Sequence, residues 1–166
     1  MNPAFLSSIF TFILIIVGCG DSTYGGGKLC LPEGTPISTP NGDITIEKLK
    51  IADLVFSFDL EKNEKVIGVV DDIISHETQS MIQINLNNGT QIDATEDHLF
   101  YLPLEKKWEK AGSLKESDNL LLEDKIQPTS VLSIRHIKNE KPIKVFNLKV
   151  RHFENSFAFK VLNHSY

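Results

Sequence analysis

The stretch CLPEGTPISTPNGDITIEKL, residues 30–49, places a cysteine at the first position of a compact β unit. We expect a short strand over Thr35–Thr39, a turn at Asn41-Gly42 and a second strand over Asp43–Ile46. Asn-Gly between two such runs is a strong short-range hairpin signal. A glycine-rich spacer precedes the cysteine. The first residue of a compact β unit is an unusual place for a structural cysteine. Cys30 is therefore a candidate nucleophile.

Further segments with β character follow, each bounded by polar or turn-forming residues. They span residues 54–58, 66–74, 81–86, 91–94, 99–102, 131–137, 142–150 and 156–162. Asn88-Gly89 gives a second hairpin turn. No stretch shows sustained helical periodicity, so we predict an all-β domain of short strands. Composition alone leaves both a sandwich and a barrel open.

A weak internal repeat relates two parts of this body. Leu49 is followed four residues later by Asp53, and Leu114 is followed four residues later by Asp118, with apolar residues after each aspartate. We count this as a weak internal repeat.

Length, charge and cysteine content limit the function classes. The chain has 166 residues and a formal charge of −5, which fits one domain plus a tail and gives no electrostatic reason to expect nucleic acid as a partner. Two cysteines do not make a disulfide framework. We expect Cys19 and Cys30 to have separate roles, and a Cys19–Cys30 bridge is the alternative.

The N-terminal region has the pattern of an export signal. Residues 9–17 (IFTFILIIV) are apolar apart from one threonine, a length typical of a signal-peptide core. Ile16–Cys19 resembles the lipobox of bacterial lipoproteins, which implies that Cys19 is lipidated. Met1–Phe5 contains no lysine or arginine, and an uncleaved signal anchor or a plain secretory signal are the alternatives. We expect an exported protein, attached to the membrane through this leader.

These observations give a three-part organisation. Residues 1–19 form the leader, and residues 20–29 (GDSTYGGGKL) form a flexible glycine-rich tether. Residues 30–166 form the domain.

A second short motif follows the segment 91–94. Thr95-Glu-Asp-His98 is a Thr-x-x-His tetrapeptide, which alone is a weak signal for a site. Here it stands 65 residues after Cys30 and follows an Asn-Gly turn and a strand. With this context, residues 30–58 and 89–102 resemble the two signature blocks of the Hint superfamily, which contains inteins, the hedgehog autoprocessing domain and bacterial intein-like domains. The chain resembles the bacterial intein-like type.

The resemblance implies a flattened β horseshoe with pseudo-two-fold halves and a self-processing reaction. Cys30 would attack the carbonyl carbon of Leu29 and convert the Leu29–Cys30 peptide bond into a thioester by an N-to-S acyl shift. His98 would protonate the leaving nitrogen, and the Thr95 hydroxyl with loop N–H groups would stabilise the oxyanion. Such a domain acts in a single turnover and requires no metal, nucleotide or redox cofactor.

The C-terminal end determines what happens to the thioester. Hint members that splice end in His-Asn followed by a nucleophile, whereas this chain ends Asn163-His164-Ser165-Tyr166. If His164 matches the penultimate histidine, Ser165 stands where asparagine is needed, and serine cannot cyclise. If Asn163 is the asparagine, histidine follows it and is unsuitable as an acceptor. We therefore expect N-terminal cleavage or acyl transfer to water, a thiol or another nucleophile, and not splicing.

Two further polar residues are candidate auxiliaries. The segment 145–150 resembles the penultimate strand of the family, which often carries aspartate where Asn147 stands. His152 lies three residues before the position at which inteins commonly have a histidine. Asn147, His152 and Asn163 are therefore auxiliary candidates beside Cys30, Thr95, His98 and His164.

Other functions compete with self-processing. An inactive Hint-fold lipoprotein acting as a binding or structural module is the main alternative. A metal site from Cys30, His98, His152 and His164 lacks the usual ligand spacing. A papain-like protease would need a helix to carry its cysteine.

Overall fold

The computed structural model of the chain describes residues 29–124 and 128–166. Within these ranges the helical structure is limited to two 3₁₀ turns, η1 (Ile46–Lys48) and η2 (Ala111–Ser113). All other regular elements are strands, so the predicted all-β class is confirmed. The leader over residues 1–19, with Cys19, and the tether up to residue 28 lie outside the described residues. No helix in the described part of the chain is long and apolar enough to cross a membrane.

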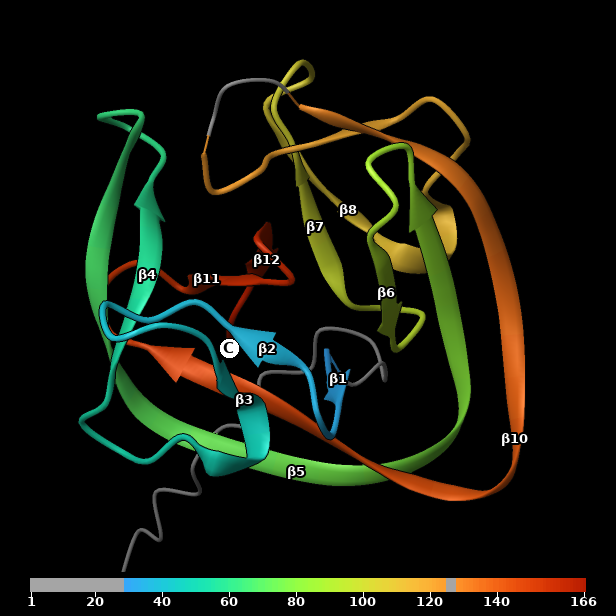
Figure 1. Cartoon of the computed structure of the whole chain (residues 1–166), viewed down its shortest axis with the longest axis horizontal. Helices are drawn as coiled ribbons and strands as arrows, with labels where there is room; N and C mark the ends of the chain where they lie inside the picture. Colours follow the sequence, from blue (N-terminus) through green and yellow to red (C-terminus); the bar gives the residue numbers. More distant parts are fainter. Residues whose placement is uncertain (1–28, 125–127) are drawn as a thin grey trace, which may run out of the picture.

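The first sheet has six strands, and its central pair is the longest in the molecule. β10 and β5 pair with each other, β1 and β4 flank them, β6 also pairs with β5, and β9 pairs with β10, all antiparallel. Figure 1 shows β5 and β10 curving together around three sides of the molecule. The strands are β1 (Leu31–Pro32), β4 (Leu54–Asp59), β5 (Glu64–Leu86), β6 (Gln91–Ala94), β9 (Asn119–Leu120) and β10 (Thr129–Val150).

The second sheet lies inside this curved pair and has the order β3-β2-β11-β12-β7-β8. It contains the C-terminal strand β12 between β11 and β7. The strands are β2 (Pro36–Ile37), β3 (Ile44–Thr45), β7 (Leu99–Leu102), β8 (Lys107–Lys110), β11 (Asn155–Ala158) and β12 (Val161–His164).

Two pairs of predicted strands are continuous. Segments 66–74 and 81–86 belong to the single strand β5, and segments 131–137 and 142–150 belong to β10. The middle of β5, residues 71–80, has no fully buried residue, so the apolar alternation that identifies a strand is interrupted there. The register shifts between Lys138 and Ile143, which introduces a bulge at this point of the β5–β10 pair.

One segment predicted as a single strand forms parts of two strands in the structure. The segment 156–162 contains the end of β11, a turn at Phe159-Lys160 and the start of β12. Both turn residues have positive φ, 51° and 64°. Glycine or asparagine normally occupies such positions, so the sequence Phe-Lys gives no turn signal.

The predicted repeat is confirmed in detail. The Asp53 carboxylate accepts from the Lys50 N–H at 2.8 Å, and the Asp118 carboxylate accepts from the Lys115 N–H at 2.8 Å. Ala52 and Ser117, the residues before the two aspartates, have φ of 75° and 74°. The two halves are offset by 65 residues, which is also the separation of Cys30 and Thr95. These two residues therefore occupy equivalent positions in the two halves.

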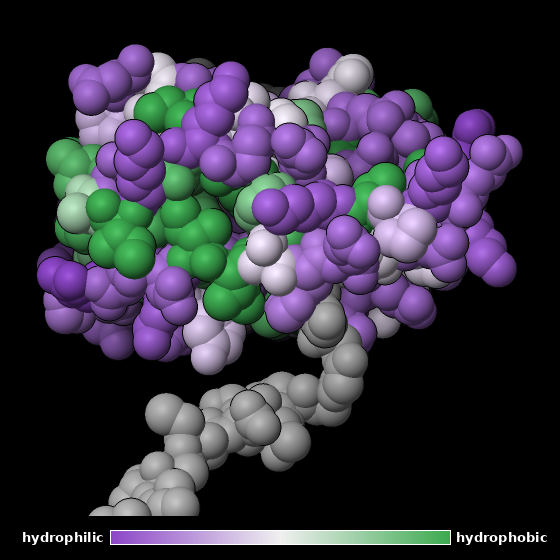
Figure 2. All heavy atoms as spheres, turned by 90° about the horizontal axis from the view of Figure 1, so that it is seen from below, coloured by the Kyte–Doolittle hydropathy of each residue, from purple (hydrophilic) through white to green (hydrophobic). Residues whose placement is uncertain are grey.

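The core lies between the two sheets. It gathers buried side chains from both halves, including Ile37, Ile84, Phe100 and Val161. The outer surface is largely hydrophilic, although Figure 2 shows apolar residues gathered toward one end of the face in view. The exposed large hydrophobic residues include Ile51, Leu54 and Ile67.

Candidate functional site

Hydrogen bonds join the backbone of Cys30 to the backbone and hydroxyl of Thr95. Cys30 immediately precedes β1, and Thr95 immediately follows β6. The Cys30 N–H donates to Thr95 Oγ1 at 2.9 Å, and the Thr95 N–H donates to the Cys30 carbonyl at 3.0 Å. Thr95 Oγ1 also lies 3.2 Å from that carbonyl oxygen, to which its hydroxyl can donate. The Thr95 hydroxyl therefore contacts the nitrogen of the Leu29–Cys30 peptide bond.

His98 is fully buried just before β7, and one polar contact orients its ring. His98 Nε2 lies 3.2 Å from Asn163 Oδ1 on β12. The Asn163 amide group donates to the Ser156 carbonyl at 2.8 Å, which directs its oxygen toward the histidine. Because that oxygen only accepts, the neutral imidazole carries its proton on Nε2. Nδ1 is then unprotonated and makes no hydrogen bond in the neutral tautomer.

Burial keeps the His98 imidazole neutral. Desolvation is the main cause that lowers its pKa from 6.5 to about 4, and the nearby His164 lowers it further. The hydrogen bond with Asn163 and the Leu29 backbone act in the opposite direction. The imidazole therefore lies close enough to Leu29 for that backbone to stabilise its protonated form.

Asn147 lies opposite Cys30 in the first sheet. The antiparallel register of β1 and β10 continues to a pairing of Cys30 with Asn147. The Glu33 N–H donates to the Lys144 carbonyl at 3.2 Å, so that pair is a hydrogen-bonded one. Hydrogen-bonded and non-hydrogen-bonded pairs alternate along antiparallel strands, which makes Cys30–Asn147 a non-hydrogen-bonded pair with closely spaced side chains.

The Asn147 side chain faces the same side of the sheet as Cys30. Val145, two residues earlier on β10, belongs to the same buried cluster as Cys30, whereas Leu148 belongs to the main core on the other face. Asn147 is 3% exposed, and its Oδ1 accepts from the Leu148 N–H at 2.8 Å. Its Nδ2 is buried without a hydrogen-bond partner. A fixed, unsatisfied donor therefore faces the side of the sheet that carries Cys30.

The remaining predicted residues make other contacts, although His164 lies near enough to His98 to lower its pKa. His164 packs its ring on Trp108, with ring centroids 5.2 Å apart, and burial lowers its pKa. His152 is exposed in the turn after β10. Ser165 is buried, and its N–H donates to the Glu154 carbonyl at 2.8 Å. The fold therefore brings together Cys30, Thr95, His98, Asn147 and Asn163.

The described residues do not support the proposed metal ligand set. Across residues 29–124 and 128–166 no group of three or more histidine, cysteine or acidic side chains is arranged to hold a metal ion. Cys30 lies before a strand and not on a helix, which differs from the arrangement expected of a papain-like protease.

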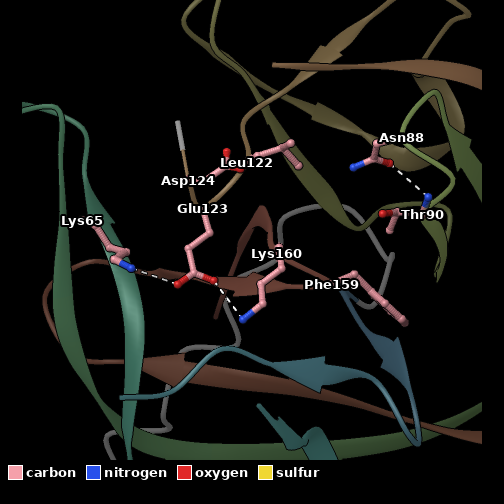
Figure 3. A pocket seen from close by; sticks show the side chains of 8 residues that line it. All are labelled: Lys65, Asn88, Thr90, Leu122, Glu123, Asp124, Phe159 and Lys160. Carbon is pink, nitrogen blue, oxygen red and sulfur yellow. Dashed lines mark hydrogen bonds and ion pairs between the residues drawn. The ribbon is translucent and has the colours of Figure 1, made fainter. Parts of the chain in front are cut away.

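A cavity of about 460 Å³ lies away from these residues (Figure 3). Lys65 Nζ and Lys160 Nζ approach the Glu123 carboxylate from either side, at 3.0 and 3.2 Å. These ion pairs hold the β11–β12 turn to β5 and to the loop after β9. The lining residues are Lys65, Asn88, Thr90, Leu122, Glu123, Asp124, Phe159 and Lys160.

A second cavity, of about 260 Å³, is lined in part by Thr95, and sequence reasoning did not identify its other lining residues. Glu96 and Asp97 stand between Thr95 and His98 in the tetrapeptide, which is a signal that could have identified them. Glu77 lies in the middle of β5 and has no local signal.

Comparisons with known proteins identify the family and the fold. The model of the pretoxin HINT domain family matches residues 36–163. A bacterial intein-like domain from Clostridium thermocellum is 28% identical, with a TM-score of 0.77 over 83% of this chain and 99% of its own. A DnaB intein from Synechocystis is 17% identical, with a TM-score of 0.73 over 82% of this chain and 98% of its own.

No curated protein matches the chain. The family match spans 128 of the 166 residues and includes Thr95, His98, Asn147 and Asn163. The predicted Hint fold is confirmed by both comparisons. The chain therefore belongs to the pretoxin HINT domain family.

Proposed function

We propose that residues 30–166 form a self-processing domain that converts the Leu29–Cys30 peptide bond into a thioester and then releases or transfers the N-terminal segment. The Hint and intein fold is that of self-processing domains in general. The observation that carries the thioester mechanism is the contact of the Thr95 hydroxyl with the Cys30 amide nitrogen at 2.9 Å. The buried His98 lies beside this bond, and the Leu29 backbone stabilises its protonated form.

Thr95 orients the nucleophile and the scissile nitrogen. Its hydroxyl and its N–H together contact both backbone polar groups of Cys30. Holding reacting groups in one geometry contributes to catalysis by removing the entropy cost of orientation. We assign this positioning role to Thr95 and assign oxyanion stabilisation to other donors.

His98 acts first as a base and then as an acid. Its neutral imidazole presents an unprotonated Nδ1, which takes the thiol proton as Cys30 Sγ bonds to the carbonyl carbon of Leu29. The imidazolium then gives that proton to the Cys30 nitrogen as the C–N bond breaks. With a pKa near 4, the protonated ring is a strong acid and protonates the poor amide leaving group readily.

Asn147 supplies the donor that the developing oxyanion needs. Its Nδ2 is buried, has no hydrogen-bond partner and faces the side of the sheet that carries Cys30. A fixed donor of this kind needs no reorganisation when charge develops on the Leu29 carbonyl oxygen. The amide also differs from the aspartate common in the family, because it cannot take up a proton.

The C-terminal strand supports His98 and takes no chemical step of its own in this proposal. Both polar atoms of the Asn163 side chain are bonded, to His98 and to Ser156. The product is the domain with Cys30 at its N-terminus, freed from residues 1–29. If Cys19 is lipidated, this cleavage releases the domain from the membrane and leaves a short lipopeptide there.

The test is the intact mass of a fusion protein with a soluble carrier placed before residues 20–166. Wild-type protein incubated with dithiothreitol or hydroxylamine should yield a fragment that begins at Cys30. Cys30→Ala should yield none, and His98→Ala should yield it much more slowly. Wild-type protein that stays uncut under both conditions would refute the proposal and favour a binding module.

A further inference from the structure

Ser165 has a buried hydroxyl group that makes no hydrogen bond. The residue is 1% exposed, and its Oγ is one of the few buried side-chain atoms in the described part of the chain without a partner. A buried hydroxyl normally finds a partner, because leaving it unpaired costs the full desolvation of the group. The Ser165 hydroxyl therefore requires an explanation other than stability.

The residue after Ser165 lies at the edge of β10, beside the scissile bond. Continuing the register of β1 and β10 one step beyond Cys30 sets Leu29 opposite Leu148. Because the Cys30 pair is not hydrogen-bonded and the two kinds of pair alternate, the N–H and carbonyl of Leu148 face the β1 edge. The Tyr166 N–H donates to that carbonyl at 2.6 Å. Ser165 and Tyr166 therefore lie next to Leu29.

The hydrogen bonds of Leu148 release the Leu29 carbonyl from the β10 ladder. In a regular antiparallel pair, the Leu148 N–H would donate to the Leu29 carbonyl. Instead, this N–H donates to Asn147 Oδ1 at 2.8 Å, and the Leu148 carbonyl accepts from Tyr166. The carbonyl group that Cys30 would attack is therefore not tied to β10, and its oxygen can take new donors.

The pairing of β11 with β12 directs the Ser165 side chain. The Ser165 N–H donates to the Glu154 carbonyl at 2.8 Å, which extends the ladder of these two strands by one pair. Side chains two residues apart on a strand share a face, so Ser165 faces the same side as Asn163. Asn163 contacts His98 on that side. The Ser165 hydroxyl therefore points to the side of the second sheet that holds the histidine.

We propose that the Ser165 hydroxyl is a second donor to the oxyanion that develops on the Leu29 carbonyl oxygen. This inference rests on the proposed function, in which Asn147 is the first donor. Asn147 precedes Leu148 in the chain, and Ser165 is joined to Leu148 through the Tyr166 hydrogen bond, so two unpaired donors flank the residue opposite Leu29. An unpaired, fixed donor has no hydrogen bond to break when the charge develops. The role is non-covalent, and the hydroxyl keeps its proton.

The proposal predicts opposite effects on stability and on rate at one residue. Ser165→Ala removes an unsatisfied buried hydroxyl, so the midpoint of urea unfolding, measured together with Cys30→Ala to prevent cleavage, should stay the same or rise. On the fusion protein in saturating hydroxylamine, where the acyl shift limits the rate, Ser165→Ala should slow cleavage by roughly 10²-fold, since one oxyanion donor contributes that much. A residue that only supported the fold would not separate the two effects in this way.

Ser57→Ala is the matched control. Ser57 is equally buried, but its hydroxyl donates to the Asn155 carbonyl at 2.9 Å. Its removal leaves that carbonyl without this donor, so the urea midpoint should fall. Cleavage by the folded protein should continue at the wild-type rate.

A pair of substitutions at Tyr166 tests the placement of Ser165. Tyr166→Pro removes the N–H that binds the Leu148 carbonyl, and Tyr166→Ala keeps it. We expect the proline variant to slow cleavage and the alanine variant to retain the wild-type rate. Adding Ser165→Ala to the proline variant should slow it little further, because the hydroxyl is already displaced. Equal rates in the two Tyr166 variants would contradict this placement and overturn the proposal.

A wild-type rate in Ser165→Ala, or a lower urea midpoint in that variant, would overturn the donor role while leaving Cys30-dependent cleavage intact. A species with the mass of the uncut protein, in which both the amine and the thiol of Cys30 are free, would also overturn it, because Ser165 would then carry the N-terminal segment as an ester. Absence of cleavage in the wild type would overturn the proposed function and this inference with it.

Discussion

The Asn163 amide oxygen lies 3.2 Å from His98 Nε2 and fixes which nitrogen of the histidine is a base. The two residues are 65 positions apart and belong to neighbouring strands of the second sheet, β12 and the start of β7. Under the proposed function this contact gives the C-terminal strand a role in the reaction at Cys30, because it directs the unprotonated Nδ1 away from β12.

Replacing Asn163 should remove the contact that keeps the His98 proton on Nε2. Asn163→Ala leaves a buried imidazole N–H and the Ser156 carbonyl without partners, so we expect the free energy of unfolding to fall by about 1–3 kcal/mol. Cleavage should slow by roughly tenfold, since proton transfer by a positioned base contributes at least that much. Asn163→Asp should retain the tautomer and raise the pKa of His98, which NMR titration of the ring would detect. An Asn163→Ala variant that cleaves at the wild-type rate would contradict this role.

The buried His98 makes stability depend on pH. The unfolded chain binds a proton on this residue below pH 6.5, whereas the folded chain binds it only near pH 4. The unfolded state therefore holds more protons in this window, and the free energy of unfolding should fall by about 3 kcal/mol between pH 7 and pH 4. Burial lowers the pKa of His164 as well, which adds a change of the same sign.

Urea unfolding of Cys30→Ala at several pH values measures this dependence without interference from cleavage. Adding His98→Gln should flatten the curve between pH 6.5 and 4, and His152→Gln, at an exposed residue, should not. A pH dependence that is the same with and without His98 would show that the residue is not held neutral.

The Thr95 hydroxyl should matter more than its methyl group. Thr95→Val has nearly the same shape but removes the acceptor for the Cys30 N–H, and we expect a loss of about 1–3 kcal/mol in stability from the unsatisfied donor. The N–S acyl shift should slow because the scissile nitrogen is no longer held. Thr95→Ser should retain most of the rate. Equal cleavage by the valine and serine variants, followed by mass spectrometry over time, would exclude a positioning role.

Asn147 should act through its donor and not through its size. Asn147→Asp replaces the Nδ2 donor with an acceptor, and removing an oxyanion donor typically lowers a rate by about 10²–10³. The loss should be smaller at low pH, where the carboxyl group is protonated and can donate again. The matched control is Asn85→Asp on β5, whose side chain bonds Ser133 at 3.0 Å outside the site. Comparable losses in both variants would point to general destabilisation.

The sequence by itself determined the local elements and the family to which the chain belongs. The hairpins at Asn41-Gly42 and Asn88-Gly89 form where predicted, and both glycines have the positive φ that such turns require. The segments Gln91–Ala94 and Leu99–Leu102 match β6 and β7 in their bounds. These features depend on a few neighbouring residues, so a sequence displays them directly.

The turn at Phe159-Lys160 and the continuity of β5 and β10 were decided by tertiary structure. The turn residues adopt positive φ without glycine, and two ion pairs of Lys160, with Glu123 and Asp43, hold it from outside the hairpin. In β5 the residues that cross between the two halves lack a buried face, so no periodicity marks them as strand. Neither feature follows from local propensity.

The candidate site depends on both the sequence and the tertiary structure. Cys30, Thr95 and His98 carry a recognisable spacing, but their arrangement around one peptide bond depends on the pairing of β1 with β10 and of β7 with β12. The same pairing places Asn147 opposite Cys30 and brings Asn163 to His98. Residues that are distant in sequence meet only after long-range strand pairing. The sequence therefore identifies the candidate nucleophile, and the fold decides which polar groups surround it.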